Sequence, residues 1–251
     1  MLSDDQLLRY SRQIMLGDID VQGQENLQAA KVLIVGLGGL GSPVAMYLAA
    51  AGVGHLTLVD DDLVEISNLQ RQIIHDEQSV GKSKVASAKA RITALNADVE
   101  VRCVERRLTS SELDVLTAQV DLVVDCTDNF QSRFMINRSC VIHLTPLVSG
   151  AAIRMEGQLL TVDPRVANSP CYQCLYPVAG NDDLSCAQSG VLAPLVGVIG
   201  SMQAIEAIKV LTGVGETLVG RLQIFDAKTM QWQTFKLKAD ASCSVCAEKI
   251  S

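Results

Sequence analysis

Short apolar runs alternate with longer mixed segments through the first half of the chain. The short runs have the length and β-branched composition of buried strands, and the longer segments are typical of helices that cover a sheet. Strands are predicted at 31–36, 55–60, 99–105, 121–128 and 146–152, and helices at 42–51, 82–95, 111–118 and 131–142. This alternation predicts an α/β fold with a doubly wound, mostly parallel, Rossmann-like sheet.

The pattern changes after Met155, where the predicted strands become hairpin-like. These strands are expected at 158–162, 221–227 and 232–237, around an apolar segment at 191–211. We interpret residues 1–251 as one domain, in which 155–251 form a β-rich annex on the core of residues 1–154.

Three glycines, Gly36, Gly38 and Gly41, follow the first predicted strand and open the first helix. In this setting a phosphate can approach the backbone, and the free N–H groups of the helix point at it. The second strand ends in Asp60, an acid placed to bind a ribose hydroxyl. A tight turn whose glycines only allow close packing is the alternative. The combination favours a nucleotide site in residues 1–154.

Further polar residues lie where ligands of such sheets bind, at the carboxyl ends of the strands. Asp128 could hold Mg²⁺, which prefers oxygen ligands, or Asp128 and Asn129 could cap the next helix. Lys82 and Lys84 lie at a predicted helix start, where the helix dipole disfavours cations. A triphosphate above Lys84 would explain its position, whereas Lys82 is better explained as solvated.

The eight cysteines include two Cys-x-x-Cys pairs, Cys171/Cys174 and Cys243/Cys246. Two such pairs complete a closed Cys₄ site, which is typical of structural zinc. The metal would join the annex to the C-terminal tail. A thioredoxin-like redox pair is the alternative, but it requires a pair after a strand and at a helix start, and Pro170 does not suit it.

The remaining cysteines divide into two kinds. Cys103, Cys126 and Cys140 lie on apolar strand or helix stretches and are predicted to be core residues. Cys186 lies in a polar, glycine-closed segment, where it is either an incidental loop cysteine or an exposed thiol that could relay sulfur.

Composition excludes several classes of function. The net charge of −7 argues against nucleic acid as a partner. The N-terminus has no basic, apolar leader, and eight cysteines without one indicate a reducing cytoplasm. The uncharged stretch 186–205 is long enough to suggest a membrane-spanning helix. Pro194 and the polar residues within the stretch favour a buried segment of the protein instead.

Together these motifs resemble the MoeB/ThiF/ubiquitin-activating enzyme superfamily over nearly the whole chain. The resemblance rests on both cysteine pairs and on Arg9-Tyr-Ser-Arg12-Gln, Gly36-Leu-Gly-Gly-Leu-Gly41, Ser67-Asn-Leu-Gln-Arg71-Gln and Asp125-Cys-Thr-Asp128-Asn. The segment 149–158 is most similar to the MoeB (molybdopterin-synthase adenylyltransferase) branch, with ThiF second. Arg9 and Arg12 alone would be typical of a solvated helix face.

The resemblance implies ATP-dependent adenylation of a small ubiquitin-like sulfur carrier that ends in Gly-Gly. That carrier would be MoaD, for molybdenum cofactor biosynthesis, or ThiS, for thiamine. The resemblance also implies a homodimer in which Arg12 acts in trans, and a catalytic set of Arg12, Arg71, Lys84 and Asp128. Contacts to ATP or its magnesium are implied for Gly39, Asp60, Ser67, Asn68, Leu69, Gln70, Arg71, Lys84, Asp128 and Asn129.

The implied reaction needs no general base, because a C-terminal carboxylate with a pKa of roughly 3.5 is ionised at neutral pH. Catalysis is expected from positioning and from charge neutralisation by cations. The histidines, His55, His75 and His143, lie outside the motifs. An NAD-dependent oxidoreductase would explain the glycine loop but not Arg71 or Lys84, and a nucleotide-free zinc scaffold would leave the loop without a role.

Overall fold

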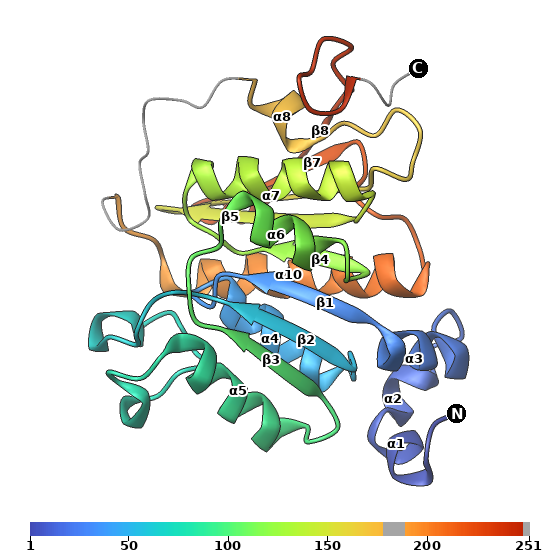
Figure 1. The fold of residues 1–251 in the computed structure, drawn as a ribbon, viewed down its shortest axis with the longest axis vertical. Helices are drawn as coiled ribbons and strands as arrows, with labels where there is room; N and C mark the ends of the chain where they lie inside the picture. Colours follow the sequence, from blue (N-terminus) through green and yellow to red (C-terminus); the bar gives the residue numbers. More distant parts are fainter. Residues whose placement is uncertain (178–188, 248–251) are drawn as a thin grey trace.

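One eight-stranded sheet runs through the computed structural model, which describes residues 1–177 and 189–247 (Figure 1). The strand order is β3-β2-β1-β4-β5-β6-β7-β8. Pairing is parallel from β3 to β5 and antiparallel from β5 to β8. The strands are β1 (Lys31–Val35), β2 (His55–Val59), β3 (Glu100–Val104), β4 (Leu122–Asp125), β5 (Leu147–Ile153), β6 (Glu156–Val162), β7 (Arg221–Asp226) and β8 (Gln231–Lys236).

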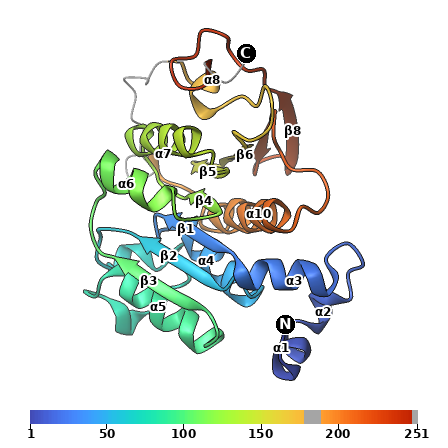
Figure 2. The same ribbon diagram turned by 45° about the vertical axis from the view of Figure 1, so that its right-hand side comes forward.

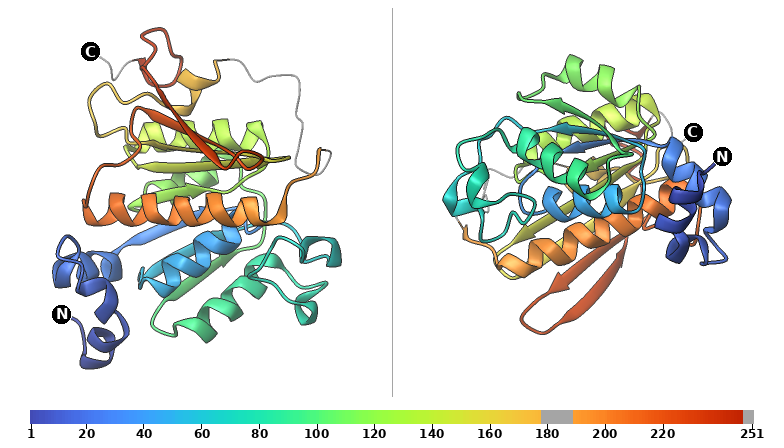
Figure 3. Two further views of the ribbon diagram at one scale, coloured as in Figure 1. Left: turned by 180° about the vertical axis from the view of Figure 1, so that it is seen from behind. Right: turned by 90° about the horizontal axis from the view of Figure 1, so that it is seen from below.

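Helices cover both faces of the parallel half. Figure 3 shows α4, α5 and α10 on one face and α6 and α7 on the other. The helices are α1 (Asp4–Arg9), α2 (Ser11–Ile14), α3 (Asp20–Ala29), α4 (Gly41–Ala50), α5 (Lys84–Leu95), α6 (Ser110–Thr117), α7 (Phe130–His143), α8 (Tyr172–Leu175) and α10 (Ala193–Thr212). The predicted doubly wound, mostly parallel sheet with a β-rich continuation is therefore confirmed.

Alternate residues of the central strand supply the two cores. Val32 and Ile34 of β1 face α4, α5 and α10, whereas Leu33 faces α6 and α7, and all three side chains are fully buried. Successive side chains of a strand point to opposite faces, so a strand covered on both faces is apolar throughout. This explains the continuous apolar run that predicted the strand.

The fourth strand is shorter than its predicted range of 121–128, because β4 ends at Asp125. The Asp125 side chain accepts hydrogen bonds from the N–H (3.0 Å) and the hydroxyl (2.7 Å) of Thr127. Such a local turn gives the backbone an alternative to the sheet ladder. Asp128 therefore lies in the loop beyond the strand.

The helix predicted at 82–95 begins at Lys84, because Ser83 is its N-cap and accepts a hydrogen bond from the Ala86 N–H.

The apolar segment forms α10, which is long and apolar enough to cross a membrane by length and composition. It packs against α4, β5 and β6. Its buried Gln203 donates to the Asp125 carbonyl (2.7 Å), and its buried Glu206 accepts from the Thr161 hydroxyl (2.7 Å) and the Leu218 N–H (2.8 Å). A helix whose buried polar side chains bond to the neighbouring protein segments in this way is typical of a protein core.

Candidate nucleotide and metal sites

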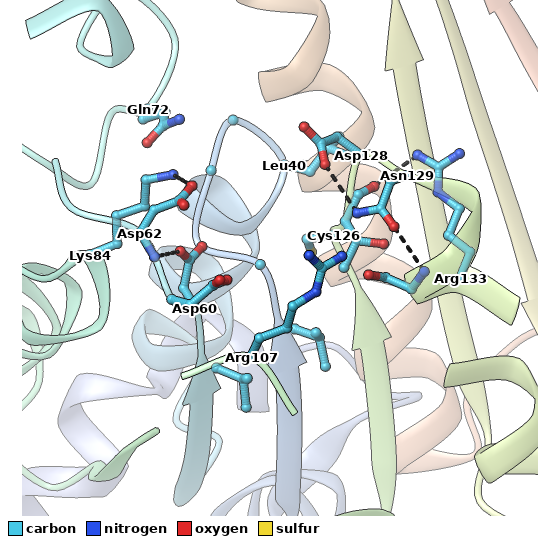
Figure 4. A pocket seen from close by; sticks show the side chains of 18 of the residues that line it. Leu40, Asp60, Asp62, Gln72, Lys84, Arg107, Cys126, Asp128, Asn129 and Arg133 are labelled. Carbon is cyan, nitrogen blue, oxygen red and sulfur yellow. Dashed lines mark hydrogen bonds and ion pairs between the residues drawn. The ribbon is translucent and has the colours of Figure 1, made fainter. Parts of the chain in front are cut away.

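A cavity of about 490 Å³ lies at the carboxyl ends of β1, β2 and β4 (Figure 4). Side chains and backbone from the loops that follow β1, β2, β3 and β4 line it, as expected for a sheet of this topology. Of the residues implied by the resemblance, the lining includes Gly39, Asp60, Asn68, Arg71, Lys84, Asp128 and Asn129. Ser67, Leu69 and Gln70 of the same motif lie outside the lining, whereas their neighbour Gln72 belongs to it.

The glycine loop joins β1 to α4 at the centre of the cavity. Gly36 has a φ of +92°, and a Cβ there would lie 2.8 Å from the Cys126 carbonyl oxygen. A Cβ on Gly41 would collide with the Gly36 carbonyl oxygen. Only glycine suits these positions, since side chains disfavour positive φ and would fill the space. The loop thus exposes backbone N–H groups at the start of α4.

Asp60 fixes this loop from the end of β2. One carboxylate oxygen accepts the Leu37 N–H (2.6 Å) and the other accepts the Asp62 N–H (2.9 Å). Burial raises the pKa of Asp60 above its ordinary value, and the nearby Lys84 charge opposes that rise. The carboxylate therefore positions the glycine loop, in addition to the ribose role expected for an acid at this place.

Lys84 is the first residue of α5 and is buried beside the cavity. Its Nζ lies 2.7 Å from a carboxylate oxygen of Asp62 (Figure 4). Lys82 is exposed and outside the lining. A buried lysine at a helix start is unfavourable unless an anion lies nearby. Asp62 supplies one such anion, and a phosphate in the cavity would supply a second.

Asn129, and not Asp128, caps the next helix: its side-chain oxygen accepts the Ser132 N–H (2.9 Å). Asp128 is exposed in the cavity wall, and its one hydrogen bond among the described residues comes from the Asn129 amide (3.4 Å). In contrast, Asp60 and Asp62 of the neighbouring acidic cluster are occupied by backbone N–H groups and Lys84. Asp128 is therefore better placed than Asp60 or Asp62 to bind Mg²⁺.

Arg133 also lines the cavity, although the sequence motifs did not include it. Its guanidinium donates to the Thr127 carbonyl (2.8 Å) and lies over the Phe130 ring, 5.8 Å from the centroid. The sequence could have indicated Arg133 through its position four residues after Asn129, because residues at that spacing share a helix face.

His75 is a second residue that sequence reasoning set aside. It is buried; its Nε2 lies 3.1 Å from the Leu37 carbonyl oxygen and its Nδ1 lies 2.9 Å from the Ser87 hydroxyl. The backbone of Leu37 is thus held at its N–H by Asp60 and at its carbonyl by His75, which also contacts Ser87 of α5. Burial lowers the pKa of His75 below 6.5, so the neutral ring is favoured.

Two predicted residues lie elsewhere. Arg12 is exposed on α2, among the helices that precede β1 (Figure 2). The cavity lies at the opposite end of β1, and a five-residue strand spans about 16 Å. Cys186 lies outside the described residues.

The four paired cysteines come together between α8 and the C-terminal segment. Their sulfur atoms all lie within 4.8 Å of one another. The separations are 3.9 Å for Cys171–Cys174, 3.7 Å for Cys171–Cys243 and 3.4 Å for Cys174–Cys246. Four sulfurs at 2.3 Å from one tetrahedral zinc are about 3.8 Å apart, whereas a disulfide requires about 2.05 Å. The cluster fits a closed Cys₄ zinc site.

Neither Cys126 nor Cys140 is a reactive thiol. Both are buried, and burial raises the pKa of each well above its ordinary value. Cys103 is partly buried, and burial raises its pKa as well. The prediction that these three are core residues agrees with their positions.

Comparison with known proteins agrees with this architecture. The model of the ThiF family matches residues 10–245. The chain is 49% identical over 247 residues to the molybdopterin-synthase adenylyltransferase of Escherichia coli K12, covering 98% of this chain and 99% of that protein. It is 44% identical over 245 residues to the sulfur carrier protein ThiS adenylyltransferase of the same organism, covering 98% and 97%. The crystal structure of E. coli MccB with ATP has the same fold, with a TM-score of 0.84, 24% identity and coverage of 95% of this chain and 74% of that one.

Proposed function

Because the chain belongs to the ThiF family, we propose that it transfers AMP from ATP to the C-terminal carboxylate of a small sulfur-carrier protein. The observation that carries this proposal is the convergence of a glycine-rich helix start, the buried Lys84 and the exposed Asp128 in one cavity. The molybdopterin-synthase carrier is the preferred substrate, since the relative named for it is the more similar of the two adenylyltransferases from E. coli. The ThiS-type carrier is the alternative.

The reaction joins two anions. An oxygen of the carrier's carboxylate bonds to the α-phosphorus, the bond from that phosphorus to the bridging oxygen breaks, and pyrophosphate leaves with the electron pair. Lys84, Arg71 and the N–H groups of the glycine loop would neutralise the developing charge. When bound through Asp128, Mg²⁺ would add to that neutralisation.

No side chain is needed as a general base, since the carboxylate is already ionised. His75, the histidine nearest the loop, has both ring nitrogens in hydrogen bonds with the protein. We therefore assign it a positioning role. A nicotinamide-dependent dehydrogenase, the remote alternative, has no use for the buried Lys84 facing Asp62.

A homodimer with Arg12 in trans belongs to the same proposal. Arg12 lies on α2, before β1 and far from the cavity of its own chain, which supports its assignment to the cavity of a second copy. Exposed apolar side chains on the segment that follows α2 and on helices α4 and α10 support a partner at this surface. They are Met15, Leu16, Tyr47 and Ile205. Helices α4 and α10 contact each other. We place the enzyme in the cytoplasm, as its free cysteines predict.

The proposed function is tested by ATP–pyrophosphate exchange with each purified carrier. We expect exchange that depends on a carrier with an intact C-terminal Gly-Gly, and none with a carrier that lacks the last glycine. The preferred carrier is the one with the higher kcat/KM. Absence of exchange with both carriers, from a folded and zinc-loaded protein, would refute the proposal, and reduction of NAD with a candidate substrate would favour the dehydrogenase.

Mixing two inactive variants tests the dimer. Arg12→Ala and Lys84→Ala protomers would form heterodimers in which one site takes Lys84 from one chain and Arg12 from the other. After random exchange about a quarter of parent activity should return, since half of the dimers carry one intact site of two. No recovery despite demonstrated subunit exchange would contradict action in trans.

A further inference from the structure

The connection between β3 and α6 passes over the cavity. Strand β3 lies at the edge of the sheet beside β2. Helix α6 packs against α7, on the face of the sheet opposite to α4 and α5 and on the far side of β1 from β3. The chain must therefore cross the carboxyl ends of β2 and β1 between these elements (Figure 1). Two adjacent arginines, Arg106 and Arg107, lie on this crossing and line the cavity.

The two arginines differ in what holds them. The Nε and Nη2 of Arg106 both donate to one carboxylate oxygen of Glu112 (3.1 and 2.9 Å), and Glu112 also caps α6 through Thr109. Arg107 is exposed, and within residues 1–177 and 189–247 its guanidinium has no ion pair or hydrogen bond. Figure 4 shows it directed into the cavity, between Asp60 and Asp128.

Four apolar side chains form one wall of the cavity. They are Leu108, which directly follows Arg107, Leu113 of α6, and Met135 and Ile136 of α7. The polar end is opposite, at Lys84, Arg71 and Asn68. With phosphates at that end and at the glycine loop, and the ribose at Asp60, the base of a nucleotide falls against the apolar wall and beneath the β3–α6 connection.

We propose that Arg107 covers the adenine of bound ATP, with its guanidinium plane stacked on the ring; this rests on the proposed use of ATP. A guanidinium stacks on aromatic faces because it is planar, delocalised and weakly hydrated, properties that a lysine ammonium lacks. The apolar wall holds one face of the base and Arg107 the other. Arg106 cannot substitute, because Glu112 holds it.

The adenine does not react, so a contact to it is equally strong before and during the reaction. Loss of such a contact raises the KM for ATP and leaves kcat unchanged. We expect Arg107→Ala to weaken binding of ATP roughly 3- to 30-fold. Because Arg107 is exposed, the variant should keep its fold and its zinc.

Calorimetric binding of ATP and of adenosine distinguishes the base from the phosphates as the group contacted. For a base contact, Arg107→Ala weakens both ligands by the same factor, Arg107→Lys does not restore binding, and Arg107→Trp does, because its ring can stack. Arg102→Ala removes an exposed charge from the preceding strand β3 and serves as the matched control.

Three outcomes would overturn the proposal. One is a loss confined to ATP and restored by lysine, which would place Arg107 on the phosphates. The second is unchanged binding of both ligands in Arg107→Ala, and the third is a parent protein that binds neither. Carrier-dependent exchange is measured in parallel, so a failure of the adenylyltransferase assignment with intact adenosine binding is recognised separately.

Discussion

The cavity lies at the parallel half of the sheet and the cysteine cluster packs beside the antiparallel half, and different interactions hold the two sites. In the parallel half, the protein's own hydrogen bonds position the site: Asp60 and His75 bind the N–H and the carbonyl of Leu37, and Asn129 caps α7. In the antiparallel half, four thiols face one another, and the Asp240 N–H donates to one of them at 3.4 Å. The chain itself preorganises the first site, whereas the second fits a metal ion that would complete it.

An aromatic cluster joins the two sites. Phe130 and Phe134 of α7 contact Tyr172 and Tyr176, which lie in and next to α8, with ring centroids 5.0 to 6.1 Å apart. The Tyr172 N–H also donates to the side chain of Asn137 in α7. Disorder at the metal site can therefore reach the helix that carries Asn129. The following experiments test how independent the two halves are.

Of the variants considered, Lys84→Ala should give the largest change, a loss of ATP–pyrophosphate exchange. Lys84→Ala takes a fixed charge from the cavity, and loss of one such contact costs about 3 kcal/mol, or on the order of 10²-fold in exchange rate. Zinc content should stay unchanged, because the metal lies in the other half. Lys82→Ala, which removes an exposed neighbouring charge, should change the rate by less than about twofold. Equal losses in both variants would show that bulk charge, and not position, matters.

Breaking the metal site should chiefly affect stability. The parent should contain about one zinc per chain, and Cys174→Ser should lose it. A metal held at a hundredfold its Kd stabilises the native state by about 2.7 kcal/mol. For a chain of this size that corresponds to roughly 5–11 °C in Tm.

Metal analysis and melting curves measure these effects, with Cys103→Ser as the control that keeps its metal. ATP affinity within a few-fold of the parent would confirm that the halves are independent. A large loss of affinity would show coupling through the aromatic cluster, and a variant that kept both metal and Tm would remove the structural role of zinc.

A smaller effect is expected from His75, which should make the free energy of unfolding depend on pH. The unfolded chain binds a proton at about pH 6.5, and burial lowers the pKa of the folded form. The contribution of His75 to stability is therefore complete above pH 6.5 and is lost as the pH falls below it, by at most about 1.4 kcal/mol per pH unit. Urea unfolding at pH 7, 6 and 5 should show a shallower decline of stability for His75→Gln than for the parent. The control is His55→Gln, which changes a partly exposed histidine that lies beside Glu100 at the start of β2. Identical slopes would exclude His75 as the titrating group.

The smallest effect is predicted for Cys186, which lies outside the described residues. Adenylation needs an ionised carboxylate, ATP and fixed positive charge, so Cys186→Ala should leave carrier-dependent exchange within a few-fold of the parent. Pathway output in cells separates the carriers: output that survives favours the molybdopterin carrier, and output that collapses while exchange persists favours ThiS. Loss of exchange itself would place the thiol in the adenylation step.

Local pattern was enough for much of this protein. The buried strand before the glycine loop, the loop itself and the chelating spacing within each cysteine pair depend on residues a few positions apart, and a sequence shows these directly. Asp60, Asp128 and Asn129 were predicted to lie together, because parallel strands bring their carboxyl ends to one edge of the sheet, and all three line the cavity. Lys84, which also lines it, was predicted from the unfavourable place of a cation at a helix start. The end of β4 was missed, because a side-chain turn at Asp125 outcompetes the apolar run.

Only the tertiary structure showed that His75, Arg107 and Arg133 lie at this site. His75 matters through Leu37, which is distant in sequence, and the two arginines matter because separate elements bring them to one cavity. The hydrophobic pattern of the sequence does not show such contacts, because they arise from the strand order and from the crossing of the chain between β3 and α6. The meeting of the two cysteine pairs is of the same kind. Their chemistry was legible in the chain, but their distance of less than 4.8 Å depends on how α8 and the tail pack.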